Sequence, residues 1–257
     1  MDAAAILARL DAERRTLRRD GEVIETLPRV TRLRPDDAAY HCLTFSALTP
    51  DTADAAIAEQ IAHYRALCAP FEWKVYSHDQ PPDLLVRLAR HGFAIGPKEA
   101  VLVLDLTPPA PWLHDPPPCE ILRVQSSDDV TLFRAAAEEI FAKDYALTAT
   151  QLERSLRTGS THHRAYMAMV AGVPAAIGRL YTHPNSHFGG LYGGGTRPAF
   201  RGQGLYRALV AARARAAAQS GARYLLVDAL PTSQPILQRL GFQRVADTWP
   251  CEWEPPQ

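Results

Sequence analysis

A glycine-rich loop in the second half of the chain has the residue types of an anion-binding site. The loop is Arg201-Gly202-Gln203-Gly204, and a helix is expected from Leu205 onward. The first turn of a helix has backbone N–H groups without intrahelical partners, and the helix macrodipole adds partial positive charge there. Gly202 and Gly204 lack a Cβ, which lets a ligand approach the main chain, and Arg201 adds a full charge. The loop therefore favours a phosphate or pyrophosphate as its ligand.

A tight turn is the alternative interpretation of this loop, because a Gly-x-Gly before a helix is often no more than that. The spacing matches neither Gly-x-Gly-x-x-Gly nor Gly-Lys-Ser/Thr, the two common nucleotide loops. The helix itself is well marked: Leu205, Leu209 and Ala212 lie on one face, and Gly221 ends the pattern. The order of the surrounding elements has to decide between the two interpretations.

Three consecutive glycines stand in the strand that is expected just before this loop. Gly193, Gly194 and Gly195 weaken strand pairing and would let a ligand lie along the main chain. A β-bulge or close packing against another element is the alternative. The glycine run is therefore a weaker argument for a ligand site than the loop.

The composition argues against several classes of protein. The 257 residues include 28 Lys+Arg and 28 Asp+Glu, so no basic excess would steer the chain to nucleic acid or to an acidic membrane. The four cysteines are widely spaced and fit neither a disulfide framework nor a zinc site. The N-terminus does not resemble a secretory signal, and no apolar run is long enough to span a membrane. We expect a cytoplasmic protein with no metal site.

A proline-rich segment divides the chain into two expected domains. Prolines recur throughout 108–118, and they cannot continue a helix or a central strand, so this segment is expected to be a stiff, extended linker. The first domain is then 1–107 and the second is 119–257. An amphipathic helix is expected at about 2–19, and the sequence leaves open whether its apolar face packs within the chain or forms a homodimer contact.

The second domain is expected to alternate between strands and helices. A strand over 119–124 is followed by a helix over about 127–142 and a shorter helix over about 150–157. The remaining expected elements are strands 164–170, 175–181 and 187–196, helix 204–219, strand 223–228, helix 233–240 and a strand pair within 242–253.

This order of elements, together with the loop, resembles the GCN5-related N-acetyltransferases (GNAT). The acyl-CoA loop of that family has the pattern Arg/Gln-x-x-Gly-x-Gly/Ala, which Arg201 and Gly204 match, whereas Tyr206 stands where a small residue is usual. The resemblance covers about residues 119–255. It implies an α/β (α+β) fold, with a mixed central sheet flanked by helices.

An internal repeat predicts a second copy of this fold in the first half of the chain. Leu237–Phe242 matches Leu88–Phe93 at an offset of 149 positions, and Asp228 and Asp79 have the same offset. Carried back by that offset, the 204–219 helix falls close to an expected helix of the first half. We therefore expect two tandem GNAT-like lobes.

The first of these lobes is expected to be degenerate. At the offset of 149, the glycine loop corresponds to Thr52-Ala53-Asp54-Ala55, which has neither the glycines nor the arginine. Asp54 would repel a phosphate. The first lobe would then be structural or would form one wall of the acceptor site.

The resemblance also implies the reaction and its cosubstrate. Members of the family transfer an acetyl group from acetyl-CoA to an amine by direct attack in a ternary complex, between central strands that part. The acceptor expected here is a primary amine of a small molecule. The residues expected to bind CoA are Gly195, Thr196, Arg201, Gly202, Gln203, Gly204, Leu205 and Tyr206.

The candidate catalytic residues are Glu138, Tyr192 and Ser233. Glu138 lies on the helix that borders the acceptor cleft in the family, with a solvated surface charge as the alternative. Tyr192 precedes the glycine run and would touch the acceptor, with packing as the alternative. Leu237 occupies the position where many relatives have a tyrosine that protonates the thiolate, so Ser233 is a substitute candidate for that role.

A different class of function stays open. The absence of that tyrosine and the bulk of Tyr206 are compatible with a non-catalytic acyl-CoA-binding sensor. An enzyme that uses a longer acyl group is a third possibility, because cleft depth cannot be read from the sequence.

Overall fold

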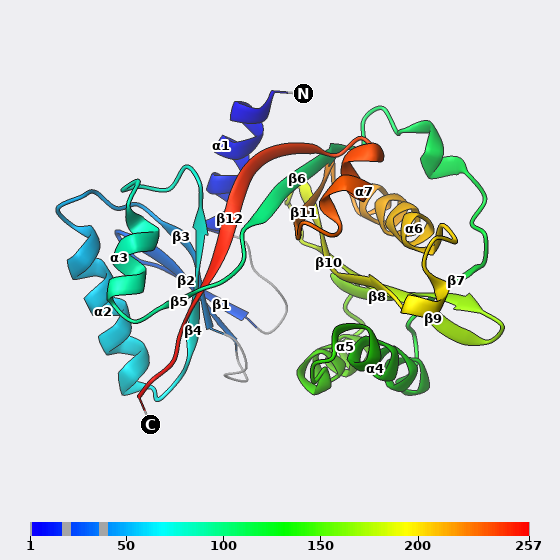
Figure 1. Ribbon diagram of the computed structural model, residues 1–257, viewed down its shortest axis with the longest axis horizontal. Coiled ribbons are helices and arrows are strands. Elements are labelled where there is room, and N and C mark those ends of the chain that lie inside the picture. The colour runs from blue at the N-terminus through cyan, green and yellow to red at the C-terminus, as the bar shows by residue number, and fades with distance from the viewer. Residues whose placement is uncertain (1, 17–21, 36–40, 257) are drawn as a thin grey trace. The chain divides into compact units, whose positions relative to one another are not determined.

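The computed structural model describes residues 2–16, 22–35 and 41–256, and its contacts divide the chain into two compact units (Figure 1). The first unit contains Met1–Leu102 together with Asp228–Gln257, and the second contains Val103–Val227. This division differs from the domains expected from the sequence, which ended the first at 107 and assigned all of 119–257 to the second.

The first unit is built on a sheet with the strand order β1-β2-β3-β4-β12, and β5 pairs with β12. Helices α2 and α3 cover one face of this sheet (Figure 1). The elements of this unit are β1 (Glu22–Thr26), β2 (Val30–Pro35), β3 (His41–Ser46), β4 (Phe71–Tyr76), β5 (Ala94–Ile95), β12 (Gln243–Trp253), α1 (Ala3–Arg14), α2 (Ala53–Ala66), α3 (Leu84–Arg90) and α7 (Gln234–Arg239).

The core of the first unit lies between the sheet and the two helices α2 and α3. Trp73 and Leu43 of the sheet are fully buried there, with Tyr64 of α2 packed beside them. Helix α1 buries Ile6 and Leu10, so its apolar face packs within the chain. This observation answers, for the described residues, the question that the sequence left open.

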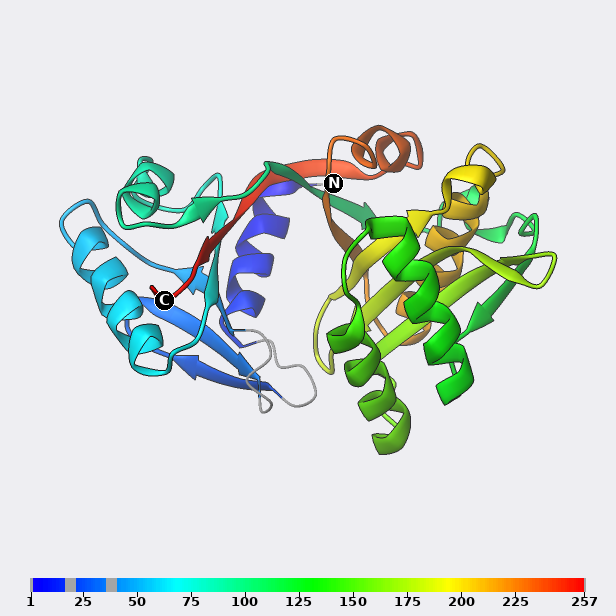
Figure 2. The ribbon, with the colours of Figure 1, turned by 60° about the horizontal axis from the view of Figure 1, so that its bottom comes forward.

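The second unit is built on a sheet with the strand order β11-β10-β9-β8-β7. Helices α4 and α5 cover one face, and α6 covers the other (Figure 2). Its elements are β7 (Glu120–Arg123), α4 (Ser127–Phe141), α5 (Ala146–Thr158), β8 (His163–Val170), β9 (Val173–Thr182), β10 (Phe188–Thr196), α6 (Leu205–Gln219), β11 (Tyr224–Ala229, which ends in the first unit) and the short 3₁₀ turns η1 (Pro111–His114) and η2 (Pro198–Phe200); β6 (Glu99–Asp105) leads into it from the first unit.

Local sequence signals explain several boundaries in this unit. Helix α4 begins at a capping box, in which the Ser126 side chain accepts from the backbone N–H of Asp129 and the Asp129 carboxylate accepts in return. Strands β8 and β9 form the expected hairpin, with Ala171 (φ 49°) and Gly172 (φ 77°) at its two-residue turn. The helix expected at about 150–157 is longer, since α5 begins at Ala146.

The central strands of the second unit part beside the glycine run. Strands β10 and β11 are parallel and pair over Phe188–Gly190 and Tyr224–Leu226, and the structure records no pairing between them beyond Gly190. Strand β10 continues along β9 instead, with a bulge between Tyr192 and Gly195. Gly193 has a φ of +52° at this bulge, so a left-handed residue is needed there.

The first unit repeats the arrangement at the centre of the second. Strands β3 and β4 are parallel and are joined by α2, and among the described residues they pair over His41–Leu43 and Phe71–Trp73. The offset between the copies is not constant: α2 and α6 begin at Ala53 and Leu205, which are 152 positions apart, whereas the offset at Phe93 is 149. Asp79 follows β4 while Asp228 lies inside β11, so these two residues are not equivalent.

The C-terminal strand belongs to the first unit. Instead of the expected strand pair, residues Gln243–Trp253 form one long strand, and its Thr248–Trp253 part pairs antiparallel with Phe71–Tyr76 of β4. Cys251 and Trp253 are buried in the core of the first unit. A sequence pattern predicts that a segment is a strand, but it does not say which distant edge that strand will join.

Candidate functional site

The glycine loop adopts a conformation that only glycine accommodates easily. Gly202 and Gly204 both have a φ of +77°, and Gly204 is the N-cap residue of α6. A Cβ at Gly202 would meet no described atom within 4 Å, so the backbone conformation, not crowding, requires the glycine. All four residues of the loop are exposed. The first backbone N–H groups of α6 therefore lie beside an exposed loop, where the helix dipole and Arg201 provide positive charge.

The side chains around the loop fall into two groups. Arg201 is exposed, and its Nε donates to the carbonyl of Thr196 at 3.3 Å, which holds the guanidinium beside the end of β10. The side chain of Leu205 is buried, and the Tyr206 ring packs towards β10, where burial raises the pKa of its phenol. Of the predicted CoA-binding residues, Leu205 can therefore offer a ligand little beyond its backbone N–H.

A cavity of about 270 Å³ borders the loop along one side of α6. Its lining includes Trp112, Gln203, Gly204, Arg207 and Arg215. Arg207 is paired with Asp115, and Arg215 Nη1 donates to the carbonyl of Leu113 at 2.5 Å. The proline-rich segment is thus part of the second unit and forms one wall of a cavity. The sequence predicted a stiff, extended linker between two domains; in the structure these arginines hold the segment against α6.

On the other face of the sheet, Tyr192 stands directly before the bulge. Its Cα is opposite that of Arg179 in β9, and its ring meets Tyr181 edge to face, with ring centroids 5.1 Å apart. The Tyr192 side chain is 37% exposed, so one side of the ring remains accessible. Tyr192 is thereby the predicted catalytic residue nearest the bulge along the chain.

The two other catalytic candidates have hydrogen-bond partners in the structure. Glu138 Oε1 accepts from Arg134 Nε at 2.7 Å and from the backbone N–H of Tyr145 at 3.4 Å. The Ser233 hydroxyl donates to the carbonyl of Leu230 at 3.2 Å in the turn before α7, which lies in the first unit. The sequence missed Arg179 and Trp112, because no motif or spacing marked either residue.

The corresponding helix of the first unit has a carboxylate in its first turn. Asp54 accepts from Arg87 Nη1 at 2.5 Å and contacts His91 Nε2 at 3.1 Å. The hydrogen bond with His91 lowers the pKa of the Asp54 carboxyl, as does the charge of Arg87, so it is anionic at neutral pH. An aspartate takes the favourable place at the start of α2 that a phosphate would need.

Parallel central strands that part beside a glycine-rich loop and a helix N-terminus define the GNAT class of fold. Residues 132–242, which run from α4 past the loop to the end of α7, match the acetyltransferase (GNAT) family. Over these residues the chain is similar to that family, whose description names acetyltransferases. No curated protein matches the chain.

Solved structures with the same fold cover almost the whole chain. A GCN5-related N-acetyltransferase from Kribbella flavida has a TM-score of 0.68 at 17% identity, over 99% of this chain and 95% of that one. A functionally unknown conserved protein from Staphylococcus epidermidis has a TM-score of 0.68 at 16% identity, over 93% and 96%. A tandem GNAT protein from the clavulanic acid biosynthesis pathway has a TM-score of 0.56 at 17% identity, over 89% and 79%. These likenesses show that the fold is shared.

Two features of the described residues bear on other classes of protein. No helix there is long and apolar enough to cross a bilayer. In the same ranges, no group of three or more His, Cys, Asp or Glu side chains is placed to hold a metal ion.

Proposed function

We propose that the protein is an N-acetyltransferase that moves the acetyl group of acetyl-CoA to a primary amine of a small molecule. In one ternary complex, the amine nitrogen forms a bond to the acetyl carbon while the carbon–sulfur bond breaks. CoA leaves as its thiolate, and the attacking nitrogen loses one proton. The exposed glycine loop at the start of α6 carries this proposal, and the family match over 132–242 supports it.

The diphosphate of CoA is proposed to bind the loop. The backbone N–H groups of residues 202–206 and the side chain of Arg201 would contact it. This suits the exposure of residues 201–204 and the positive charge at the start of α6. The main chain of Gly195 and Thr196, at the end of β10, is proposed to bind the pantetheine arm. Acetyl-CoA supplies an already activated acyl group, so the protein has mainly to position it and to stabilise an oxyanion.

The nucleotide end of CoA is proposed to enter the cavity beside the loop. Trp112 is an aromatic residue of the lining and Arg215 offers positive charge, whereas the charge of Arg207 is paired with that of Asp115. Addition of CoA should change the tryptophan fluorescence of the wild-type protein, and the change should be absent from Trp112→Phe. An equal change in both proteins would place the nucleotide elsewhere.

The acid and base are proposed from the three sequence candidates. Tyr192, beside the bulge, is proposed to contact the acceptor. Glu138 would act as a base only if its bond with Arg134 opened, and Ser233 as an acid only if its hydroxyl left the Leu230 carbonyl. A strong acid is not essential, because the CoA thiolate is a fairly good leaving group.

The decisive experiment places a negative charge in the loop. Gly204→Asp should weaken CoA binding by at least about tenfold in calorimetry, because the carboxylate would stand where the diphosphate binds. Gly221→Asp is the matched control: Gly221 also has a left-handed backbone (φ 86°) but lies beyond the other end of α6. Unchanged CoA affinity in Gly204→Asp would overturn the assignment of the loop.

A second measurement separates the enzyme from a sensor. The protein is incubated with acetyl-CoA and a panel of amines, and free thiol is followed. CoA binding without thiol release from any amine would favour the non-catalytic sensor. If thiol is released faster from longer acyl-CoAs than from acetyl-CoA, the proposed donor is a longer acyl-CoA and not acetyl-CoA.

A further inference from the structure

Among the residues that the structure describes, Arg179 beside the bulge of β10 has no counterion. Arg179 is half-buried on β9, and its Nε is enclosed without a hydrogen-bond partner among the described residues. In the same part of the chain, no carboxylate lies within ion-pair distance of its guanidinium. Removing a charge from water without a partner is costly, so a half-buried arginine of this kind marks a place for an anion.

The surroundings of Arg179 are aromatic. Its Cζ lies 6.0 Å from the centroid of the Tyr181 ring, which stacks on His163 at 4.1 Å. Tyr145 is close enough for the charge of Arg179 to act on its phenol, although burial raises the pKa of Tyr145 overall. Aromatic faces attract a cation but leave its charge uncompensated. Tyr181 and His163 are buried, whereas Tyr192 is 37% exposed, so Tyr192 is the ring of this group on which a flat organic group can pack.

Arg179 is also close to the proposed reaction centre. A Cβ at Gly193 would lie 3.3 Å from Arg179 Nε, so the guanidinium rests against the main chain of the bulge. The side chains of Arg179 and Tyr192 lie on the same face of the sheet, because their Cα atoms are opposite one another in adjacent strands. An anionic group bound to Arg179 would therefore be only a few bonds away from a group that reacts at the bulge.

We propose that Arg179 binds an acidic group of the acceptor, so the acceptor is an amine that also carries a carboxylate or a phosphate. This inference rests on the proposed acetyl transfer and names the substrate class for it. Guanidinium pairs with either group through two parallel N–H···O bonds. Acceptors with several positive charges fit poorly, because one of those charges would lie against Arg179.

The experiment compares acceptors that differ only in the acidic group. The first arm pairs α-amino acids with their decarboxylated amines, for example phenylalanine with 2-phenylethylamine. The second arm pairs glucosamine 6-phosphate with glucosamine. Thiol release from acetyl-CoA gives kcat/KM for each. The anionic member of at least one pair should be preferred by roughly tenfold or more, and the arm that shows the preference identifies carboxylate or phosphate.

Three variants assign the preference to Arg179. Arg179→Met keeps the length of the side chain without the charge, and it should raise KM for the anionic acceptor roughly tenfold or more while leaving the neutral acceptor unchanged. Arg179→Lys should retain part of the preference. Arg223→Met is the control, since this exposed arginine contacts Asp105 on another part of the sheet. CoA affinity, measured by calorimetry, should be the same in all of them.

Two results would overturn the inference while leaving acetyl transfer intact. One is acetylation of neutral amines or polyamines at rates equal to or above those of every anionic partner. The other is an equal decrease of kcat/KM for the anionic acceptor and for its partner without the acidic group in Arg179→Met. If no amine is acetylated although CoA binds, the proposed acetyl transfer fails, and the inference fails with it.

Discussion

At the residue scale, close packing and backbone conformation explain the glycines of β9 and β10. A Cβ at Gly195 would lie 2.5 Å from Ile140 of α4, and a Cβ at Gly194 would lie 3.0 Å from the Tyr206 ring. Within the run, which the structure describes in full, the left-handed conformation is confined to Gly193. Both a bulge and close packing, the alternatives weighed for the sequence, are therefore present.

Gly178 is matched to a buried arginine on α6. Arg213 is 1% exposed, and it donates from Nε to the Leu209 carbonyl at 3.1 Å and from Nη1 to the Arg179 carbonyl at 3.2 Å. Burial lowers the pKa of this guanidinium. A Cβ at Gly178 would lie 2.6 Å from Arg213 Cζ, so the guanidinium fills the space that a side chain at Gly178 would need.

We predict that Gly178→Ala lowers the free energy of unfolding by about 1–3 kcal/mol, the usual cost of overpacking a filled interior. Chemical denaturation measures this loss. Adding Arg213→Met to the same chain should recover part of it, because the flexible thioether side chain can move aside. Wild-type stability in Gly178→Ala would show that Arg213 is not held in this position.

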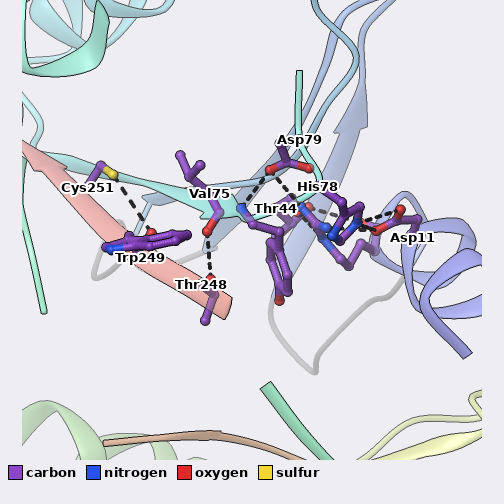
Figure 3. Close-up of polar contacts among 10 residues, drawn as sticks. Asp11, Thr44, Val75, His78, Asp79, Thr248, Trp249 and Cys251 are labelled. Carbon is purple, nitrogen blue, oxygen red and sulfur yellow. Dashed lines mark hydrogen bonds and ion pairs between the residues drawn. The ribbon is translucent and has the colours of Figure 1, made fainter. Parts of the chain in front are cut away.

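At the element scale, polar contacts attach α1 to the sheet of the first unit (Figure 3). Arg14 Nε donates to the carbonyl of Thr44 in β3 at 2.6 Å, and Arg14 Cζ lies 3.7 Å from the centroid of the Tyr76 ring. His78, just after β4, contacts the Asp11 carboxylate of α1 at 2.9 Å. The helix is therefore attached through both charged and apolar contacts.

The Asp11–His78 pair predicts a pH dependence of stability. The hydrogen bond with Asp11 raises the pKa of His78 above the usual value for a histidine, although burial and the charge of Arg14 oppose this. A histidine with a raised pKa in the folded state stabilises the protein fully below its unfolded pKa, and the contribution is lost as the pH rises through the folded value. Burial raises the pKa of the neighbouring Asp79, and the charges of Arg14 and His78 oppose that rise.

We predict that His78→Gln lowers the thermal midpoint by about 1–2 °C near pH 6 and by less near pH 9. Differential scanning calorimetry of both proteins at several pH values measures the difference. A difference in thermal midpoint between wild type and variant that increased with pH would contradict this prediction. Asp11→Asn should reproduce the effect, because it removes the carboxylate charge that helps to raise the pKa of His78.

At the scale of the whole molecule, the two units share a central arrangement but only one has the glycine loop. In the first unit, the N-cap residue of α2 is Thr52, and Asp54 occupies the first turn of that helix. We predict that calorimetric titration gives one CoA per chain. Two equivalent sites would contradict the assignment of the first unit as a degenerate copy. Loss of the single site in Gly204→Asp would assign CoA binding to the glycine loop of the second unit.

The C-terminal segment makes the units depend on one another through the chain. Strand β12 pairs with β4, and Trp253 is buried in the first unit, although both follow the second unit in sequence. We predict that residues 119–257 alone do not fold cooperatively, because β12 would lack β4 and expose an apolar edge. Circular dichroism during heating measures cooperativity; a sharp transition comparable to that of the whole chain would contradict the prediction.

The sequence by itself determined most local features of this protein. The α6 helix, the β8–β9 hairpin and the glycine loop depend on spacing, turn residues and positive-φ glycines that lie close together in the chain. The GNAT resemblance followed from the same short-range signals. The first copy was predicted only in outline: at the offset of the two helices, the loop corresponds to residues 49–52 and not to 52–55, and Asp54 corresponds to Tyr206.

Only the tertiary structure decided which distant segments meet. The exchange of β12 into the first unit, the packing of 111–118 against α6 and the position of Arg179 opposite Tyr192 all depend on long-range contacts. Hydrophobic periodicity predicts a strand but does not show which strand will lie beside it. The sequence around Arg179 likewise does not show which charged groups will lie near its guanidinium. Those partners become known only once the chain has folded, because burial and charge pairing are properties of the assembled core.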